Sequence, residues 1–463
     1  MLSILAVMPT TLPDISAATV STETRLAYVL HHFRLCYENV PAVSIDYAGQ
    51  EPQVEVVDAA ASFFSQNLPY PPEPGWREWQ GRKVPFFFDS NPAEPLLDLS
   101  ADGRATLHVD LISAAFYLLS GWQEYFSDER DQHGRFPFSA SVQHRYGFVT
   151  VPVVNYYFDI LKTAVEHVTG EPLRPRRWAK DAPFAAFITH DIDNLLSAWK
   201  APAKAALLRF DWLGFGRQLW QHFTRRDAWN NLAEVQQAVA AYGAKSTFFF
   251  LPEHQRSPDG TPNADYQLHK IWPETAAAIG SSEVGLHGSI GRAIQGGKLK
   301  EEEHRLQRCV EGQIPGIRFH YLHWEPRITP VIVSSLMFGY DTTLGFAEHF
   351  GFRNSYCNPF YPFDFNQGKS HHFLEIPLNV MDATLHHPRY LQLAPHEILP
   401  ALTPMFQEIE RFGGVCTVLW HNENFDPANT RNGPLQFRAL MEYLRGQGAA
   451  FVTGTDILGE LVI

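Results

Sequence analysis

Two carboxylates separated by one residue follow an apolar run near the middle of the sequence. The run Ala185–Ile188 is followed by His190, Asp191 and Asp193. In an extended strand, residues two apart point to the same side, so Asp191 and Asp193 project together with Cα atoms about 6–7 Å apart. Two carboxylates this close require a cation between them or a proton on one of them. The pattern indicates a metal site or an acid–base pair, although a solvated loop after a strand gives the same pattern.

Polar residues also follow other short apolar runs in the C-terminal part of the chain. The runs that we expect to form strands are Ala185–Thr189, Ser246–Leu251, Ser282–Leu286, Gly316–Phe319, Phe373–Val380, Val415–Trp420 and Ala450–Gly454. Helical patterns separate these runs, and this alternation predicts a parallel sheet or barrel. Functional residues of such folds lie at the carboxyl ends of the strands. The residues found there, besides the two aspartates, are His287, Arg318, His320 and His421.

Carboxylates, imidazoles and a guanidinium at one edge of a sheet are suited to hydrolysis. Asp and neutral His bind zinc or a similar divalent ion and leave one coordination position open for water. A second carboxylate beside that water can act as general base, and a histidine from another strand can protonate the leaving group. The residue types therefore predict a metal-dependent hydrolase.

Five segments of this region share their order and spacing with the motifs of one enzyme family. The segments are Thr189–Asp193, Lys245–Phe249, Glu283–Ser289, Arg318–Tyr321 and Val418–His421. Together they resemble the aspartate, second-strand, metal, arginine and closing Leu-x-His motifs of the polysaccharide deacetylases, the NodB-homology proteins of carbohydrate esterase family 4. The resemblance covers about residues 183–463. It implies an α/β fold, an irregular (β/α) barrel of the NodB-homology type.

The resemblance also implies a role for each matching residue. Asp191 would be the general base that activates water, and Arg318 would orient its carboxylate through a charge-assisted pair. His421 would protonate the departing amine. The substrate-binding residues would be Leu419, which would line the pocket for the acetyl methyl group, Tyr321 and Trp420.

The metal site departs from the family pattern at one position. Asp193 and His287 match two of the three protein ligands, and zinc is the expected ion. The family has a second histidine four residues after the first, where this chain has Gly291. The candidates for the missing ligand are His190, His320 and His323. His320 is preferred because it follows a strand end, whereas His190 points away from the aspartates in an extended strand. The alternative is a weak site, a site for another metal, or a degenerate one.

Several residues of this region have a structural alternative. Arg318 could form a plain salt bridge, and His421 could be a capped histidine of the core. Glu375 could face the barrel interior and pair with Arg318 or Arg353. Asp341 is expected to cap the residues that follow it. The loop that fixes His421 would contain Asn422, Glu423 and Asn424.

Residues 1–180 are expected to form a separate mixed α/β domain before the barrel at 181–463. Helical spacing predicts helices at Thr22–Tyr37, Asp110–Tyr125 and Val151–Val168. The proline-rich and basic segment 170–183 is the expected boundary. The whole chain resembles a deacetylase subgroup with an N-terminal domain of unknown function, through Gly121–Tyr125, His133–Phe136, His320–Leu322, Tyr340–Gly345 and Gly351–Arg353. Single histidines are the only chemical groups that stand out in this half, so a packing or recognition role is expected.

A helical insertion is expected at about residues 194–243, between the first two strands of the barrel. Basic residues alternate there with aromatic ones such as Trp199, Phe210, Trp212 and Trp220. This composition is found in helices at membrane surfaces and also in amphipathic helices that pack on a barrel or close over it. We expect a helical cover over the strand ends rather than a lipid-binding element.

Composition limits the class of protein. The formal net charge of −13 argues against nonspecific binding to nucleic acid. The four cysteines are far apart and form no CxxC spacing, so neither a disulfide framework nor a thiolate metal site is indicated. Met1–Met8 is apolar but short and lacks a basic start, and no run of about 18 apolar residues occurs. A cytoplasmic protein without a membrane span is expected.

These observations predict a metal-dependent hydrolase that removes an acyl group, in the first place an N-acetyl group, from a sugar or polysaccharide precursor. An acylated carbohydrate is therefore the expected partner. One alternative is a carbohydrate-binding or assembly protein that has kept the barrel without catalysis. A second alternative is an amidase that acts on a small molecule other than a sugar.

Overall fold

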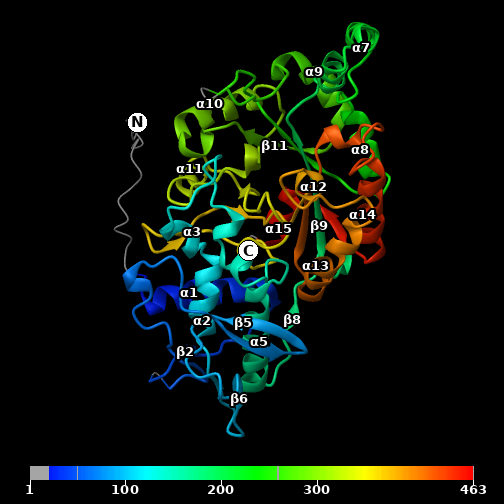
Figure 1. Ribbon diagram of the computed structural model, residues 1–463. Helices are drawn as coiled ribbons and strands as arrows, with labels where there is room; N and C mark the ends of the chain where they lie inside the picture. Colours follow the sequence, from blue (N-terminus) through cyan, green and yellow to red (C-terminus); the bar gives the residue numbers. More distant parts are fainter. Residues whose placement is uncertain (1–19, 50, 258–259, 462–463) are drawn as a thin grey trace.

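The computed structural model describes residues 20–49, 51–257 and 260–461. The apolar segment Met1–Met8 lies outside the described residues. Figure 1 shows the chain as two adjoining parts, an N-terminal part below and a C-terminal part above built around one curled sheet.

The C-terminal part is built on a nine-stranded sheet in which every pairing is parallel. Its strands are β9 (Ala185–Ile192), β10 (Thr247–Phe250), β11 (Glu283–Gly288), β12 (Gly316–Phe319), β13 (Tyr340–Asp341), β16 (Leu374–Glu375), β17 (Val380–Met381), β18 (Val415–Leu419) and β19 (Ala450–Val452). Their order is β16-β13-β12-β11-β10-β9-β18-β17, with β19 beside β9. The predicted α/β fold with a parallel, barrel-like sheet is confirmed.

All eight residues of β9 are buried, as expected for a central parallel strand that is covered on both faces. Its side chains alternate between two environments. Ala185 and Phe187 face the inside of the curled sheet, and Ala186 and Ile188 face the helices outside. The same alternation continues to the end of the strand, so Asp191 faces inward and His190 outward. A buried strand with this alternation explains why the two aspartates share one side.

Helices follow most strands and cover the outside of the sheet. They are α8 (Leu232–Ala240), α9 (Leu268–Ile279), α10 (Gly296–Gln307), α11 (Thr329–Ser335), α12 (Asp382–His386), α13 (Ile398–Phe412), α14 (Pro434–Gly446) and α15 (Gly454–Leu461). The single strand predicted at Phe373–Val380 is instead two short strands, β16 and β17, because Pro377 lies between them and cannot donate a backbone hydrogen bond. Among the described residues, no helix is long and apolar enough to cross a membrane.

The N-terminal part has its own sheets and helices. Its helices are α1 (Thr22–Cys36), α2 (Leu111–Leu119), α3 (Trp122–Phe126), α4 (Val142–Arg145) and α5 (Val153–Thr169). Its strands are β1 (Tyr37–Glu38), β2 (Ile45–Tyr47), β3 (Val54–Val56), β4 (Gly75–Trp79), β5 (Arg82–Phe86), β6 (Leu97–Leu99), β7 (Ala105–Leu107) and β8 (Arg174–Pro175). The single helix expected at Asp110–Tyr125 is broken, because Gly121 takes a left-handed conformation with φ of 72° between α2 and α3.

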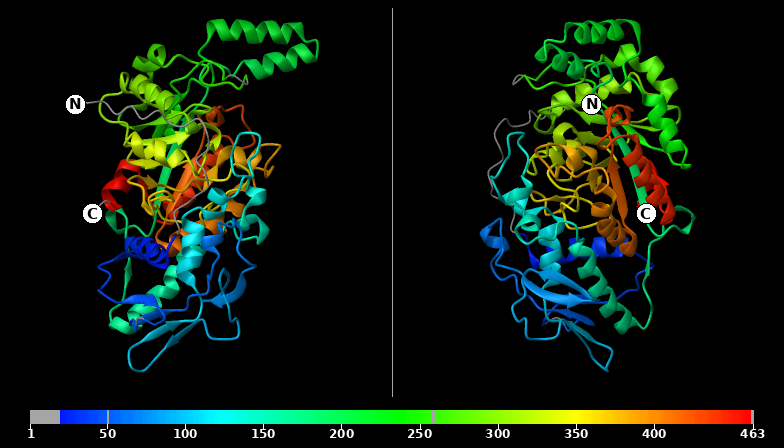
Figure 2. Two further views of the ribbon diagram at one scale, coloured as in Figure 1. Left: turned by 90° about the vertical axis from the view of Figure 1, so that its left-hand side faces the viewer. Right: turned by 45° about the vertical axis from the view of Figure 1, so that its right-hand side comes forward.

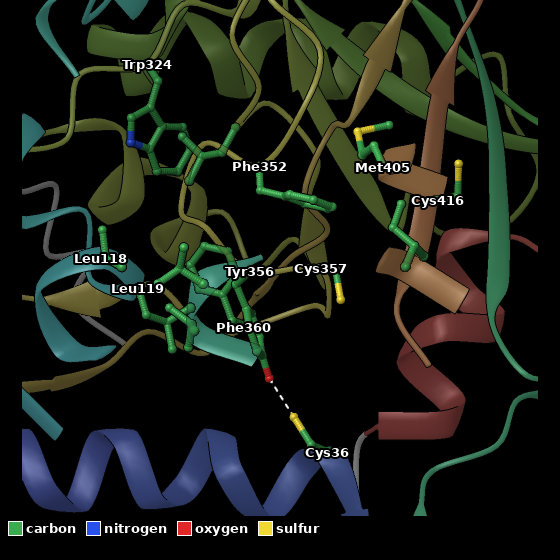
Figure 3. Packing of buried hydrophobic residues seen from close by; sticks show 14 of the residues in the cluster. Cys36, Leu118, Leu119, Trp324, Phe352, Tyr356, Cys357, Phe360, Met405 and Cys416 are labelled. Carbon is green, nitrogen blue, oxygen red and sulfur yellow. Dashed lines mark hydrogen bonds between the residues drawn. The ribbon is translucent and has the colours of Figure 1, made fainter. Parts of the chain in front are cut away.

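The two parts share one hydrophobic core. A continuous cluster of buried residues extends from α1, α2 and α5 into the barrel. Figure 3 shows the junction, where the Cys36 thiol of α1 and the Tyr356 hydroxyl lie 2.9 Å apart. Nearby, the guanidinium of Arg353 donates two hydrogen bonds to the carboxylate of Glu124, at 2.8 and 2.6 Å. Both side chains are almost fully buried, so this ion pair ties α3 to the barrel.

The helical insertion does not form the expected cover over the strand ends. Its helices α6 (Lys200–Leu208) and α7 (Trp212–Thr224) pack against each other as a hairpin. Figure 2 shows the hairpin projecting from the top of the molecule, beyond the strand ends. Only Ala203 of α6 and Gly214 of α7 are buried. A helix packed over the barrel would bury a full face, so the expectation of a lid is wrong for this hairpin.

Removal of one partner of the buried ion pair should destabilise the protein. We expect Glu124→Gln to lower the free energy of unfolding by about 3–5 kcal/mol, because Arg353 would keep its charge without a counterion. Chemical unfolding followed by circular dichroism measures the change. As a control, Glu234→Gln removes an exposed pair with Arg226 at 3.6 Å and should cost less than about 1 kcal/mol. Equal effects of the two substitutions would contradict this assignment.

Candidate functional site

Asp191 is held by an arginine from the other side of the curled sheet. Arg318, on β12, has no exposed surface, and its Nη1 donates to Asp191 Oδ1 at 2.9 Å. The guanidinium also donates to the Thr189 hydroxyl at 2.8 Å and to the Thr342 carbonyl at 2.9 Å. It lies over the Phe249 ring, 4.7 Å from the centroid. These contacts leave the second oxygen of Asp191 facing His287 Nε2 at 3.6 Å.

Asp193, His287 and His320 converge beside this pair. One ligand atom from each lies within 4.8 Å of the others. Asp193 Oδ1 is 3.3 Å from His287 Nε2, and Asp193 Oδ2 is 3.4 Å from His320 Nε2. Burial would raise the pKa of Asp193, but the two imidazoles more than reverse this effect and hold the pKa well below its usual value. The carboxylate is therefore ionised at neutral pH.

The tautomer of His287 is set by the backbone. Its Nδ1 donates to the carbonyl oxygen of Arg318 at 2.9 Å, because a carbonyl can only accept. In the neutral ring, Nε2 then carries the lone pair and faces the aspartates. This second-sphere arrangement is typical of histidines that bind metals.

The three residues fit a divalent metal ion. Two ligands about 2.0–2.1 Å from a tetrahedral zinc lie roughly 3.4 Å apart, close to the separations of Asp193 from His287 and His320. Asp193 Oδ1 is also a buried acceptor without a hydrogen-bond partner in the structure, and a cation would satisfy it. Gly291 has no side chain that could bind a metal, and His320 is placed where it could serve as the third ligand instead.

The other two candidates for the third ligand lie elsewhere. His190 is fully buried on the outer face of the sheet, and its Nδ1 donates to the Trp420 carbonyl at 2.7 Å. Burial lowers the pKa of His190 to about 4, so this ring is neutral. His323 lies against Gly134 of the N-terminal part. The contact is so close that a Cβ atom added at Gly134 would lie 2.9 Å from Nε2 of His323.

His421 follows β18, the strand that pairs with β9, and its ring faces Asp193. Its Nε2 is 3.8 Å from Asp193 Oδ2, and its Nδ1 is 2.7 Å from Asp382 Oδ1. The second oxygen of Asp382 accepts from the backbone N–H of His421 at 2.6 Å and from Asn424 at 2.5 Å. Burial alone would lower the pKa of His421, but the charge of Asp382 and the two site aspartates raise it to about 10. The buried carboxylate of Asp382 therefore fixes this ring and favours its protonated form.

Asp382 and Glu423 are site residues that the motifs did not identify. Asp382 directly follows β17, so its position at a strand end was the signal available in the sequence. Glu423 was expected only to support the loop. Its carboxylate accepts from Asn194 at 2.6 Å, and burial, together with nearby Asp193, raises its pKa to about 7.

The N-terminal part contributes to the wall of the site. The His133 ring stacks on Tyr321 with centroids 4.8 Å apart, and Tyr321 in turn contacts the His320 ring at 4.4 Å. Tyr321 and Leu322 both have positive φ, 60° and 55°, which is a strained conformation for residues other than glycine. Arg135 donates to the Tyr321 carbonyl at 3.0 Å and helps to hold this turn. Strain of this kind is often found where a loop must present a functional side chain.

Leu419 and Trp420 point to opposite sides of β18. Leu419 is buried on the inner side with Leu322 and Leu378. Trp420 is fully buried on the outer side, where its ring packs on Phe437 of α14. The ring therefore lies away from the inner side of the sheet, and the contact of Trp420 with substrate stays a prediction. Tyr321 keeps 36% of its surface exposed and is accessible.

Glu375 has a partner other than the two expected arginines. Arg318 binds Asp191, and Arg353 binds Glu124. Glu375 instead lies beside Asp341 of the neighbouring strand, and its Oε1 accepts from the Leu344 backbone at 2.8 Å. Burial and the adjacent Asp341 raise the pKa of Glu375 well above its usual value, which favours its protonated form. Asp341 accepts from the backbone N–H of Thr343 at 2.8 Å, as expected for a turn residue.

The N-terminal part can now be compared with known sequences. Residues 17–170 match a family of unknown function, DUF7033. The match ends at Gly170, the residue that directly follows α5. No curated protein matches the sequence.

Similar solved structures include deacetylases and their relatives. A Mycobacterium smegmatis protein provisionally named a polysaccharide deacetylase matches at 15% identity and a TM-score of 0.42, over 63% of this chain and 94% of that chain. PuuE allantoinase matches at 12% identity and a TM-score of 0.41, over 62% and 93%. A CE4 family pseudoenzyme from Bacillus anthracis matches at 10% identity and a TM-score of 0.31, over 64% and 72%. At such identities the roles of individual residues rest on the geometry above.

Loss of a predicted ligand should weaken metal binding. We expect the purified protein to bind one zinc ion, and His320→Ala or Asp193→Ala to weaken this binding by at least about 10–100-fold. His323→Gln removes a neighbouring histidine that does not face the site and should leave the affinity unchanged. Titration with zinc, followed by elemental analysis of the protein, measures the difference. Unchanged zinc binding in His320→Ala would remove this residue as the third ligand.

Proposed function

We propose that this protein is a metal-dependent hydrolase that removes an acyl group, in the first place N-acetyl, from an acylated sugar. The observation that carries the proposal is the convergence of five side chains at the strand ends. Asp193, His287 and His320 form a group with metal-ligand spacing. Asp191 and His421 lie on either side of this group. Asp191 is fixed by the buried Arg318, and His421 by the buried Asp382.

Asp193, His287 and His320 would hold the ion, with zinc as the expected metal. Bound there, a divalent ion supplies a Lewis acid for the acyl carbonyl and for the attacking water.

Asp191 acts as the general base. Its Oδ1 is engaged by Arg318, and its Oδ2 faces the metal-binding group, where it can accept a proton from water. Asp191 pairs with Arg318, whereas Asp193 faces His287 and His320, so the two aspartates take different roles.

His421 acts as the general acid. Its Nδ1–H is held by Asp382, so Nε2 is the position that gives a proton to the departing nitrogen. Water adds its oxygen to the acyl carbon, the bond from that carbon to nitrogen breaks, and the amine leaves with the proton from His421. The products are a carboxylic acid and an amine on the sugar.

Leu419 and Tyr321 are proposed to receive the substrate. Leu419 is part of an apolar group on the inner side of the sheet, which suits a methyl group. The exposed ring of Tyr321 at the rim suits the face of a sugar ring. Because His133 stacks on Tyr321, the N-terminal part would help to shape the sugar-binding side.

Substitution of the carboxylate behind His421 should impair turnover. We expect Asp382→Asn to lower kcat by about 10²–10⁴-fold, because the imidazole loses its orientation and the charge that favours its protonated form. Binding of zinc should change little, since Asp382 is not a ligand. Asp364→Asn alters a buried aspartate of the β14–β15 hairpin (Phe363–Asp364, Lys369–Ser370) and serves as a control with expected normal turnover.

The substrate class is tested by release of acetate from acetylated sugars, compared with linear and cyclic amides that contain no sugar. We expect acetate release from a sugar by the zinc-loaded protein, and none by Asp191→Asn. Zinc binding without hydrolysis of any compound would favour a binding protein. Hydrolysis of the amides alone would favour an amidase.

A further inference from the structure

The helix α7 exposes its apolar face. Leu213, Trp220 and Phe223 lie on one side of the helix and keep 89%, 60% and 77% of their surfaces exposed. The half-buried side of the helix is mixed, with Phe215 and Leu219 beside Gln218 and His222. Helices on the surface of globular proteins keep their large apolar residues on the side toward the core, whereas α7 leaves three of them exposed to solvent.

The turn of the hairpin extends this apolar surface. Leu208, Phe210 and Trp212 connect α6 to α7 and are 71%, 78% and 66% exposed. Residues 207–223 hold seven of the sixteen large hydrophobic side chains that are exposed in the described ranges. We call this set the hairpin apolar surface; it consists of Leu207, Leu208, Phe210, Trp212, Leu213, Trp220 and Phe223. An exposed patch of this kind marks an interaction site.

The same hairpin is positively charged, although the protein is acidic. Residues 199–226 contain six basic residues and one acidic residue, Asp211, and so carry a formal charge of +5 in a chain whose net charge is −13. The basic residues are Lys200, Lys204, Arg209, Arg217, Arg225 and Arg226. Charge of this sign favours an anionic surface as the partner.

We propose that the α6–α7 hairpin docks on the surface of an anionic lipid bilayer. Its Trp, Phe and Leu side chains would enter the boundary between headgroups and acyl chains, and its Lys and Arg side chains would contact the lipid headgroups. The two helices have 9 and 13 residues, so the hairpin is too short to cross a bilayer and lies within the interface.

A protein partner fits this surface less well. Lysine is depleted from the centres of protein interfaces, whereas Lys204 lies between the exposed positions Lys200 and Leu208 on the same side of α6. The hairpin also projects from the body (Figure 2), so its tip can reach a flat surface before the rest of the molecule does.

Docking would bring the candidate site close to the lipid headgroups. Lys200 follows Asp193 by seven positions, a distance of at most roughly 23–25 Å in extended chain. One consequence rests on the proposed function: an acylated sugar carried on a lipid would be the substrate class that such a site receives.

Vesicle co-sedimentation with the full chain tests the proposal. We expect binding to vesicles of phosphatidylcholine mixed with phosphatidylglycerol, weaker binding to phosphatidylcholine alone, and a decrease with salt. The triple variant Leu208→Ser, Phe210→Ser and Leu213→Ser should lose at least about tenfold in partitioning. The variant Lys204→Gln and Arg217→Gln should lose about fivefold for each charge removed, on the anionic vesicles only.

A matched control changes exposed apolar residues elsewhere. Met337→Ser and Leu435→Ser alter side chains that are 80% and 69% exposed, and binding should not change. Asp193→Ala should bind vesicles as the original protein does, so failure of the proposed hydrolysis and failure of docking can be told apart.

Three results would overturn the proposal. The first is no binding to either kind of vesicle, and the second is binding that survives the triple Ser variant. The third is a concentration-dependent dimer, seen by light scattering, that the triple variant abolishes, because the apolar surface would then be covered by a second copy of the chain.

Discussion

The guanidinium of Arg318 determines the arrangement of the site. It is fully buried and binds Asp191, Thr189 and Thr342. The backbone carbonyl of the same residue accepts a hydrogen bond from His287 and fixes its ring. Without this cation, two carboxylates would face each other in a low-dielectric interior, where their repulsion is costly. With it, Asp191 stays an acceptor and Asp193 is left for the histidines. A single buried charge therefore separates the roles of two residues that are chemically alike.

The curl of the sheet makes this contact possible. Arg318 lies on β12 and Asp191 on β9, with β11 and β10 between them. In a flat sheet the two strands would be roughly 14 Å apart, at about 4.8 Å for each neighbour. The long side chain of Arg318 and the curl of the sheet together bring Nη1 to 2.9 Å from Oδ1 of Asp191. The contact across the sheet also brings His320, from the end of β12, to Asp193.

Much of the fold and of the candidate site could be predicted from two features of the sequence, the residues at strand ends and the alternation of side chains along strands. Contacts between distant segments could not be predicted in this way. The positions of Asp191, Asp193, His287 and His320 follow from polar residues at the ends of buried parallel strands. Trp420 could have been assigned to the outer face, since it alternates with His421. By contrast, nothing in the sequence links Asp382 to His421 or Glu124 to Arg353, because these pairs form only when distant segments meet. The exposure of the hairpin apolar surface could not be decided from the sequence either, because periodicity identifies an apolar face but not whether that face meets the core or the solvent.

Anomalous X-ray diffraction from crystals grown with zinc tests the central claim most directly. We expect one strong peak about 2.0–2.1 Å from Nε2 of both His287 and His320 and in contact with an Asp193 oxygen. The Asp191 carboxylate should lie beside this peak and keep its bond to Arg318. A peak at another place, or a His320 ring turned away from a bound ion, would contradict the proposed metal site.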